Sequence, residues 1–219
     1  MSTTSHLPLI CFFFFVECHL HYTSHAEGLK EEKSGVFIGL QLGNSTAQLK
    51  HKYYYTNQGN VPPVEQEKED THISYGLLSG YQHWFNNNFG MRGYAIFSMY
   101  NFEVMQFGIG ADIIYNFVNV ACGNLGVFSG FQVGGMYSYD SWYWVREFKH
   151  PNPFALDTAL NIGVRYSGNK HAFELVVKIP FMGIHSGLHK PQYDQHTIDQ
   201  EEYYWQEIYS VVWRYTYSF

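Results

Sequence analysis

The segment YSVVWRYTYSF, at residues 209–219, carries the pattern that decides the fold. Counted back from Phe219, every second residue is aromatic or apolar as far as Tyr209. The other face of the same segment includes Arg214 and Ser218. A period of two is the repeat of a β-strand whose two faces meet different surroundings. The segment therefore predicts a strand with one apolar and one polar face.

The same alternation recurs upstream, from Ser34 onward. The composition agrees with it, because 19 Tyr and 18 Phe favour strands and 20 Gly give helices little support. We expect seven strands at about 36–43, 72–85, 89–100, 105–117, 125–134, 156–165 and 173–179, and an eighth that ends at 219. The sequence thus predicts an all-β fold, an antiparallel barrel of eight strands.

The connections between these strands alternate in length. Asn86, Asn87 and Asn88 make one tight hairpin turn, and the segments after the fourth and sixth strands are also short. Three connections are long and polar, at 44–70, 138–153 and 181–202, and only the short link after the third strand breaks the trend. Short periplasmic turns and long outer loops are typical of a transmembrane β-barrel in a bacterial outer membrane.

One face of the predicted strands collects almost all of the strand charges, while the opposite face is apolar. A charge on a lipid face near the bilayer midplane costs about 2–4 kcal/mol, so the charged face is predicted to line the lumen. An eight-stranded barrel is just wide enough to be filled by side chains, which predicts a plugged lumen of ion pairs, with Arg92 or Arg165 contacting Asp112 or Asp157. The predicted network consists of Arg92, Asp112, Asp157, Arg165, Glu174, Lys178 and Arg214.

Several functions stay open at this stage. A structural or surface-interaction role is the leading hypothesis, and a narrow porin-like channel and an outer-membrane lipid-modifying enzyme are the alternatives. No Ser-His motif is recognisable, so no catalytic residue, cofactor or metal is assigned and the protein is predicted not to be an enzyme. A lipocalin-like soluble barrel would turn its apolar face inward, the reverse of the polarity predicted here. Nucleic acid is not expected as a partner, because the net charge is −6 and there is no basic block.

The first 26 residues have the features of a secretory leader. The apolar stretch Leu9 to Val16 is too short to cross a bilayer as a helix, and Ser24-His25-Ala26 matches a signal-peptidase site. We therefore expect residues 1–26 to be removed and residues 27–219 to form the barrel domain. Only Cys122 would remain, so the mature protein is predicted to have no internal disulfide.

Two groups in the long loops are weaker candidates for binding sites. His185 and His189 are four residues apart, a spacing that would suit a metal on one helical face, with His196 nearby. Ordinary loop histidines are the simpler interpretation. An aromatic group beside Arg146 would suit sugar stacking or, more simply, a belt at the membrane interface; it consists of Trp142, Tyr143 and Trp144.

Residues 71–219 resemble the Helicobacter outer-membrane protein family, the Hop and Hor group. The matching motifs are Gly80-Tyr81-Gln82-His83-Trp84-Phe85, Asn88-Phe89-Gly90-Met91-Arg92, Gly108-Ile109-Gly110-Ala111-Asp112, Asn161-Ile162-Gly163-Val164-Arg165, Val177-Lys178-Ile179-Pro180 and Tyr215-Thr216-Tyr217-Ser218-Phe219. The resemblance implies an exported barrel in contact with outer-membrane lipids. Under the leading hypothesis of a structural or surface-interaction role, the outer loops face the host or the medium, where they would meet a host or surface ligand. Larger members add an adhesin domain with disulfides, for which this chain has neither the length nor the cysteines.

The last of these motifs also resembles the signal that the outer-membrane barrel insertion machinery reads. A terminal Phe219 on an alternating strand, with Tyr217 and Tyr215 on the same face, is its characteristic form. The resemblance implies that these three residues face lipid on the closing strand and that the insertion machinery is a partner.

Overall fold

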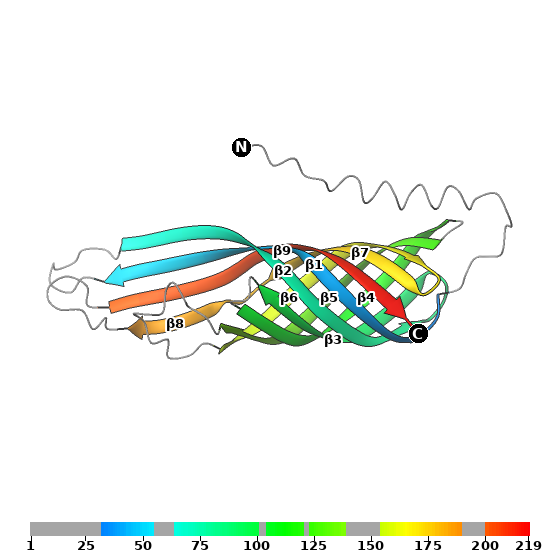
Figure 1. Ribbon diagram of the computed structural model, residues 1–219, viewed down its shortest axis with the longest axis horizontal. Helices are drawn as coiled ribbons and strands as arrows, with labels where there is room; N and C mark the ends of the chain where they lie inside the picture. Colours follow the sequence, from blue (N-terminus) through cyan, green and yellow to red (C-terminus); the bar gives the residue numbers. More distant parts are fainter. Residues whose placement is uncertain (1–31, 55–63, 101–103, 121–122, 139–153, 190–199) are drawn as a thin grey trace, which may run out of the picture.

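The computed structural model describes residues 32–54, 64–100, 104–120, 123–138, 154–189 and 200–219 (Figure 1). The predicted leader at 1–26, Cys122, the aromatic group at 142–146 and His196 lie outside the described residues. No helix within those ranges is long and apolar enough to cross a membrane.

The described chain is built from antiparallel strands joined edge to edge. Their bounds are β1 Gly35–Tyr54, β2 Val64–Trp84, β3 Phe89–Tyr100, β4 Val104–Val120, β5 Gly123–Ser138, β6 Phe154–Gly168, β7 His171–Pro180, β8 Ile184–His189 and β9 Gln200–Ser218. The strands follow one another in chain order around the sheet, and β9 pairs with β1 to close it. The prediction of an eight-stranded antiparallel barrel is confirmed, with β8 as an additional short strand that pairs along β9.

The strand that decided the prediction closes the barrel. Phe37 of β1 lies opposite Ser218, and the register continues through Leu42 opposite Trp213. On its other side β9 pairs with β7, from His171 to Lys178. Both edges are therefore satisfied, which a barrel needs when its wall stands in hydrocarbon that offers no hydrogen-bond partners.

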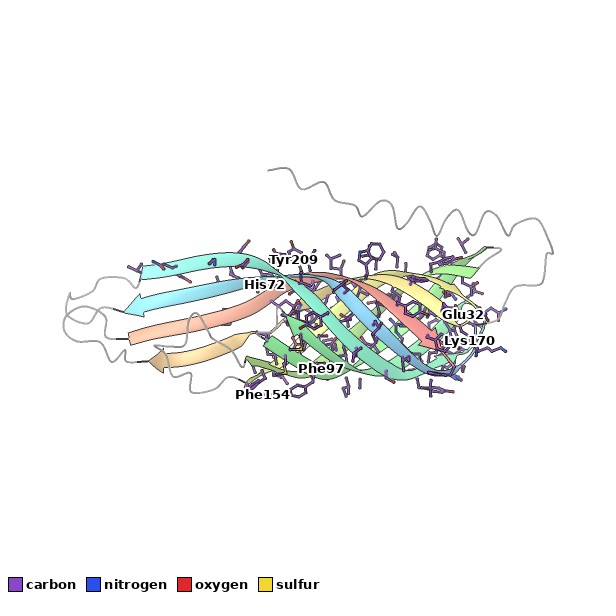
Figure 2. The ribbon with its side chains drawn as sticks, viewed as in Figure 1. Glu32, His72, Phe97, Phe154, Lys170 and Tyr209 are labelled. Atoms are coloured by element: carbon purple, nitrogen blue, oxygen red, sulfur yellow. The ribbon has the colours of Figure 1, made fainter. Side chains whose placement is uncertain are left out.

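The alternation in the sequence becomes the inside and the outside of the wall. Along β3 every second residue is buried from Gly90 to Tyr100, while Met91 and Phe97 are 45% and 41% exposed. Phe97 and Phe154 project from the outer face of the wall (Figure 2). A soluble protein rarely leaves so many large apolar side chains exposed, whereas a lipid-facing wall requires them.

The connections at one rim are tight. Asn86 caps the β2–β3 turn, its side chain accepting hydrogen bonds from the backbone N–H of Asn88 at 2.9 Å and of Phe89 at 2.8 Å. Asn169 in the β6–β7 turn has φ of 58°, in the left-handed region that Asn tolerates. The C-terminus lies at this rim (Figure 1). Short turns of outer-membrane barrels face the periplasm, so we assign this rim to the periplasmic side.

Strand occupies most of one predicted long loop and part of another, and for those residues the loop prediction is wrong. β1 continues to Tyr54 and β2 begins at Val64, so most of the predicted loop at 44–70 is a paired hairpin. The predicted loop at 181–202 contains β8 and the start of β9. These residues stand beyond the apolar belt with water on both faces, so backbone pairing persists without the apolar alternation that marks a strand in a sequence.

The hairpin and its neighbours form an open sheet that extends the barrel beyond its outer rim (Figure 1). We call this sheet the wing; it consists of β1 residues 48–54, β2 residues 64–71, β8 and β9 residues 200–206, in the order β2-β1-β9-β8. Because His185 and His189 lie on strand β8, the helical face assumed for a metal pair is absent.

Candidate functional site

The barrel interior holds all seven side chains of the predicted charge network. Each is nearly inaccessible to solvent, and Lys178, the most exposed of them, is 7% exposed. They come from five strands: Arg92 on β3, Asp112 on β4, Asp157 and Arg165 on β6, Glu174 and Lys178 on β7, and Arg214 on β9. Burying so many charges is unfavourable unless each is paired, so the contacts between them determine what the interior does.

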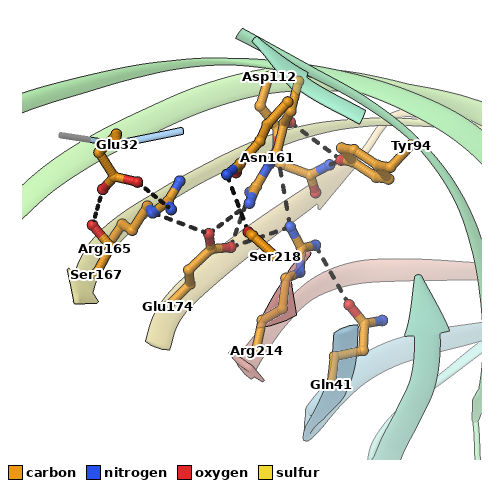
Figure 3. A network of polar contacts seen from close by, with 12 residues as sticks. Glu32, Gln41, Tyr94, Asp112, Asn161, Arg165, Ser167, Glu174, Arg214 and Ser218 are labelled. Atoms are coloured by element: carbon orange, nitrogen blue, oxygen red, sulfur yellow. Dashed lines mark hydrogen bonds and ion pairs between the residues drawn. The ribbon is translucent and has the colours of Figure 1, made fainter. Parts of the chain in front are cut away.

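Glu174 is the centre of the first group, which we call the periplasmic cluster (Figure 3). It lies 2.6 Å from Arg92, 3.5 Å from Arg214 and 3.9 Å from Arg165 in ion pairs. Arg92 donates two parallel hydrogen bonds to it, at 2.6 and 2.9 Å. This two-point geometry is the strongest form of arginine–carboxylate contact, and it fixes the guanidinium plane across the lumen. The cluster consists of Arg92, Asp112, Arg165, Glu174, Arg214 and Glu32.

Asp112 is the second acid of the periplasmic cluster. Arg92 Nη2 lies 2.7 Å from its carboxylate, and Tyr94 donates a hydrogen bond to it at 3.2 Å. The Tyr94 ring lies against β4 because Gly110 has no side chain; a Cβ there would stand 2.5 Å from Tyr94 Cζ. The Arg92 guanidinium also lies 4.8 Å from the centre of the Phe128 ring. This cation thus contacts both carboxylates and an aromatic ring.

Glu32 brings a further acid into the same cluster from the segment that precedes β1. Its carboxylate lies 3.6 Å from Arg165, and its side chain is 7% exposed. Asn124 donates a hydrogen bond to Glu32 at 3.3 Å, and Ser167 donates another. The Arg165 guanidinium also lies over the Trp84 ring, 5.5 Å from its centre. Glu32 therefore occupies part of the lumen at its periplasmic end.

The second group lies near the outer rim, and we call it the outer cluster. Lys178 contacts Glu207 at 2.8 Å and Asp157 at 3.5 Å, and it donates a hydrogen bond to Tyr100 Oη at 3.0 Å. Two further polar residues hold these acids: Gln106 donates a hydrogen bond to Asp157, and Ser45 donates one to Glu207 at 2.8 Å. One cation and two carboxylates thus span the lumen above the periplasmic cluster.

Glu207 was missed by the sequence reasoning, and the cause is a β-bulge. Counted back from Phe219 with a period of two, residue 207 falls on the lipid face. The register of β9 against β1 shifts, however, so that Thr46 lies opposite Tyr209 and Ala47 opposite Glu207. An extra residue in one strand reverses the two faces beyond it, which turns Glu207 inward. Glu32 was missed too, because it precedes the first alternating segment and carries no signal of its own.

These groups and the buried apolar side chains around them fill the interior. Among the described residues it holds four cations and five carboxylates, with Glu32 and Glu207 added to the seven predicted charges. Between the two clusters lies a cavity of about 10 Å³, lined by residues that include Gln41, Gln132, Asn161 and Ser210. A space of this size holds about one water molecule. An ion in the lumen would meet paired charges at two levels.

The outer cluster yields a stability prediction. Glu207→Ala is expected to destabilise the folded barrel by about 1.5–3 kcal/mol, because Lys178 loses a charged hydrogen bond but keeps Asp157 nearby. Urea unfolding of the refolded protein in detergent measures the change. Glu67→Ala, a matched loss of an exposed carboxylate on the wing, should shift the curve little. Equal curves for Glu207→Ala and the parent would contradict the inward placement of Glu207.

Comparison with known proteins agrees with this fold. The chain matches the family model of the Helicobacter outer membrane protein over residues 76–219. Among solved structures it is similar to the outer membrane protein OprG from Pseudomonas aeruginosa, at 12% identity with a TM-score of 0.52, covering 88% of this chain and 99% of that one. It is also similar to Neisserial surface protein A, at 11% identity with a TM-score of 0.44, covering 86% and 100%. No curated protein sequence matches it.

The likeness to OprG supports the barrel fold alone, whereas the family match covers most of the chain and includes the residues of both clusters from Arg92 to Arg214. With its apolar outer wall and closed sheet, the protein is an integral β-barrel of the bacterial outer membrane. The chain belongs to the Helicobacter outer membrane protein family.

Proposed function

We propose that the protein is a non-conducting structural barrel that holds the wing at the cell surface for interaction with a surface ligand. The observation that carries this proposal is the occupied lumen. Arg92, Glu174 and Lys178 reach across it from the wall and are held there by ion pairs of 2.6–2.8 Å. Opening a path for ions would require breaking contacts in both clusters, and each break would leave a buried charge without its partner.

The same contacts favour a structural role for the buried acids over a catalytic one. Asp112 and Glu174 are each committed to arginines, and Glu207 to Lys178. A general acid or base needs a substrate within hydrogen-bond reach, and these carboxylates are enclosed in the packed interior. Mass spectrometry of lipid A from a deletion strain tests the alternative of a lipid-modifying enzyme. Unchanged lipid A is expected, and a lost or gained modification would overturn the non-enzymatic proposal.

A conductance measurement tests the plug. The refolded protein, shown to be folded by its heat-dependent shift on a gel, is expected to leave the current through a planar bilayer at the baseline of the lipid. A general porin inserted in the same bilayer provides the control for membrane quality. Reproducible single-channel steps from the refolded barrel would overturn the non-conducting proposal and favour the narrow porin-like channel.

A further inference from the structure

One edge of the wing has no strand beside it in the described part of the chain. β3 pairs with β2 only from Ser74, which lies opposite Tyr100. The β2 residues before Ser74 are held on their other side by β1, from Val64 opposite Tyr53 to Ile73 opposite Asn44. In an antiparallel strand, alternate residues direct their N–H and C=O groups to each side. Residues 64–73 therefore present a fixed row of backbone donors and acceptors at the surface.

The side chains of this edge are open on both faces of the sheet. Every residue of 64–71 is exposed. Residues 64–73 contain four acids and one lysine. Three of the acids share one face because they are two residues apart: Glu65, Glu67 and Glu69. Lys50 and Lys52 on β1 contact Glu67 at 2.6 Å and Glu65 at 3.5 Å, which orients these carboxylates and neutralises them in part.

This charge pattern selects among the strands that might join the edge. Pairing of two copies through β2 would bring acids of one copy beside acids of the other, which is unfavourable. An apolar strand would find only Val64 and Ile73 to pack against within residues 64–73. A strand with Lys or Arg at alternate positions would place its cations beside the three acids of one face while its backbone completes the ladder.

We propose that β2 residues 65–71 bind an extended basic peptide segment by strand addition. Backbone hydrogen bonds along the edge provide the contact, and alternating cations opposite Glu65, Glu67 and Glu69 provide the selectivity. The proposal deepens the surface role and rests on it in one respect, namely that the wing faces the outside of the cell. The β1 pairing that holds the edge in register means that no part of the wing has to fold upon binding.

The test uses the full refolded barrel and labelled synthetic nonapeptides, with binding followed by fluorescence anisotropy. The probe alternates Lys and Thr. A second peptide has the same charges with Pro in place of Thr, which removes alternate backbone donors. We expect the Lys-Thr peptide to bind about tenfold or more tightly than the Lys-Pro peptide. Equal binding of the two peptides would overturn strand addition, since only charge attraction would remain.

Variants of the barrel locate the site. The triple variant Glu65→Gln, Glu67→Gln, Glu69→Gln is expected to bind the Lys-Thr peptide about tenfold less tightly. Glu201→Gln with Glu202→Gln is the control on the same wing, because it removes two charges from β9, which has neighbours on both sides. Unchanged binding by the triple variant, or an equal loss in the control, would overturn the assignment to β2. If the peptide does not bind and the barrel passes no current, strand addition is overturned and the structural barrel stands. If the barrel passes current, only the non-conducting proposal is overturned.

Discussion

Glu174→Ala is expected to destabilise the folded barrel by about 3–5 kcal/mol, because it removes the acid on which three buried arginines converge. Arg92 would keep Asp112, but Arg165 and Arg214 would keep only ion pairs of 3.6 and 3.9 Å. Urea unfolding in detergent, followed by tryptophan fluorescence and by the gel shift of the heated protein, measures the loss.

A second variant keeps this test decisive if the alanine variant does not fold. Glu174→Gln preserves the shape and one acceptor while removing the charge, so a smaller loss is expected from it. Asp112→Ala, which removes the acid nearest to Arg92 after Glu174, should also unfold at lower urea than the parent. Glu67→Ala on the wing is the control. Parent-like unfolding of both Glu174 variants would show that the cluster does not stabilise the barrel.

Deletion of Phe219 is expected to abolish most of the outer-membrane assembly of the protein in cells, with accumulation or degradation in the periplasm. The Phe219 side chain is 66% exposed, and its ring contacts Tyr217 at a centroid distance of 5.2 Å. Its backbone N–H donates one hydrogen bond to the Val36 carbonyl at 3.0 Å. Losing these contacts should weaken the fold by only about 0.5–1.5 kcal/mol. A large loss of outer-membrane assembly in cells would therefore come from failed recognition by the insertion machinery. We propose that Tyr215, Tyr217 and Phe219 form the signal that it recognises.

The comparison of cells with purified protein separates recognition from stability. Fractionation gives the outer-membrane level of the truncated protein, and refolding into detergent gives its intrinsic stability. Phe85→Ala is a matched control, because Phe85 is also an exposed phenylalanine, at 54%. It lies in the short turn between β2 and β3, outside the C-terminal segment. The variant should assemble normally. Equal outer-membrane levels of the truncated and full-length proteins would show that Phe219 is not the insertion signal.

Substitutions in the two clusters and substitutions in the wing are expected to have different effects. In the interior, carboxylates and guanidiniums are held by several partners each, so single changes there are expected to affect folding. On the wing, charged residues such as Lys50 and Glu67 pair in water, where an ion pair contributes little to stability. Changes on the wing are therefore expected to affect binding while leaving the barrel folded.

The sequence by itself determined the barrel, its closing strand and the face of each strand within the apolar belt. Arg92, Asp112 and Glu174 could be placed inside without coordinates, since a lipid-facing wall and a filled lumen impose a period of two that is local in the chain. The same alternation placed Tyr217 on the apolar face of the strand that pairs with β1.

Only the tertiary structure decided which charges meet and how far the strands extend. Glu174 faces arginines from β3, β6 and β9, and such contacts depend on how the wall curves around the lumen. Glu207 turns inward through a bulge that is defined by the register against β1. The wing was not foreseen because its strands have water on both faces. There, backbone pairing with the neighbouring strand maintains the extended conformation. Such strands need no alternation of apolar residues, so the sequence gives no sign of them.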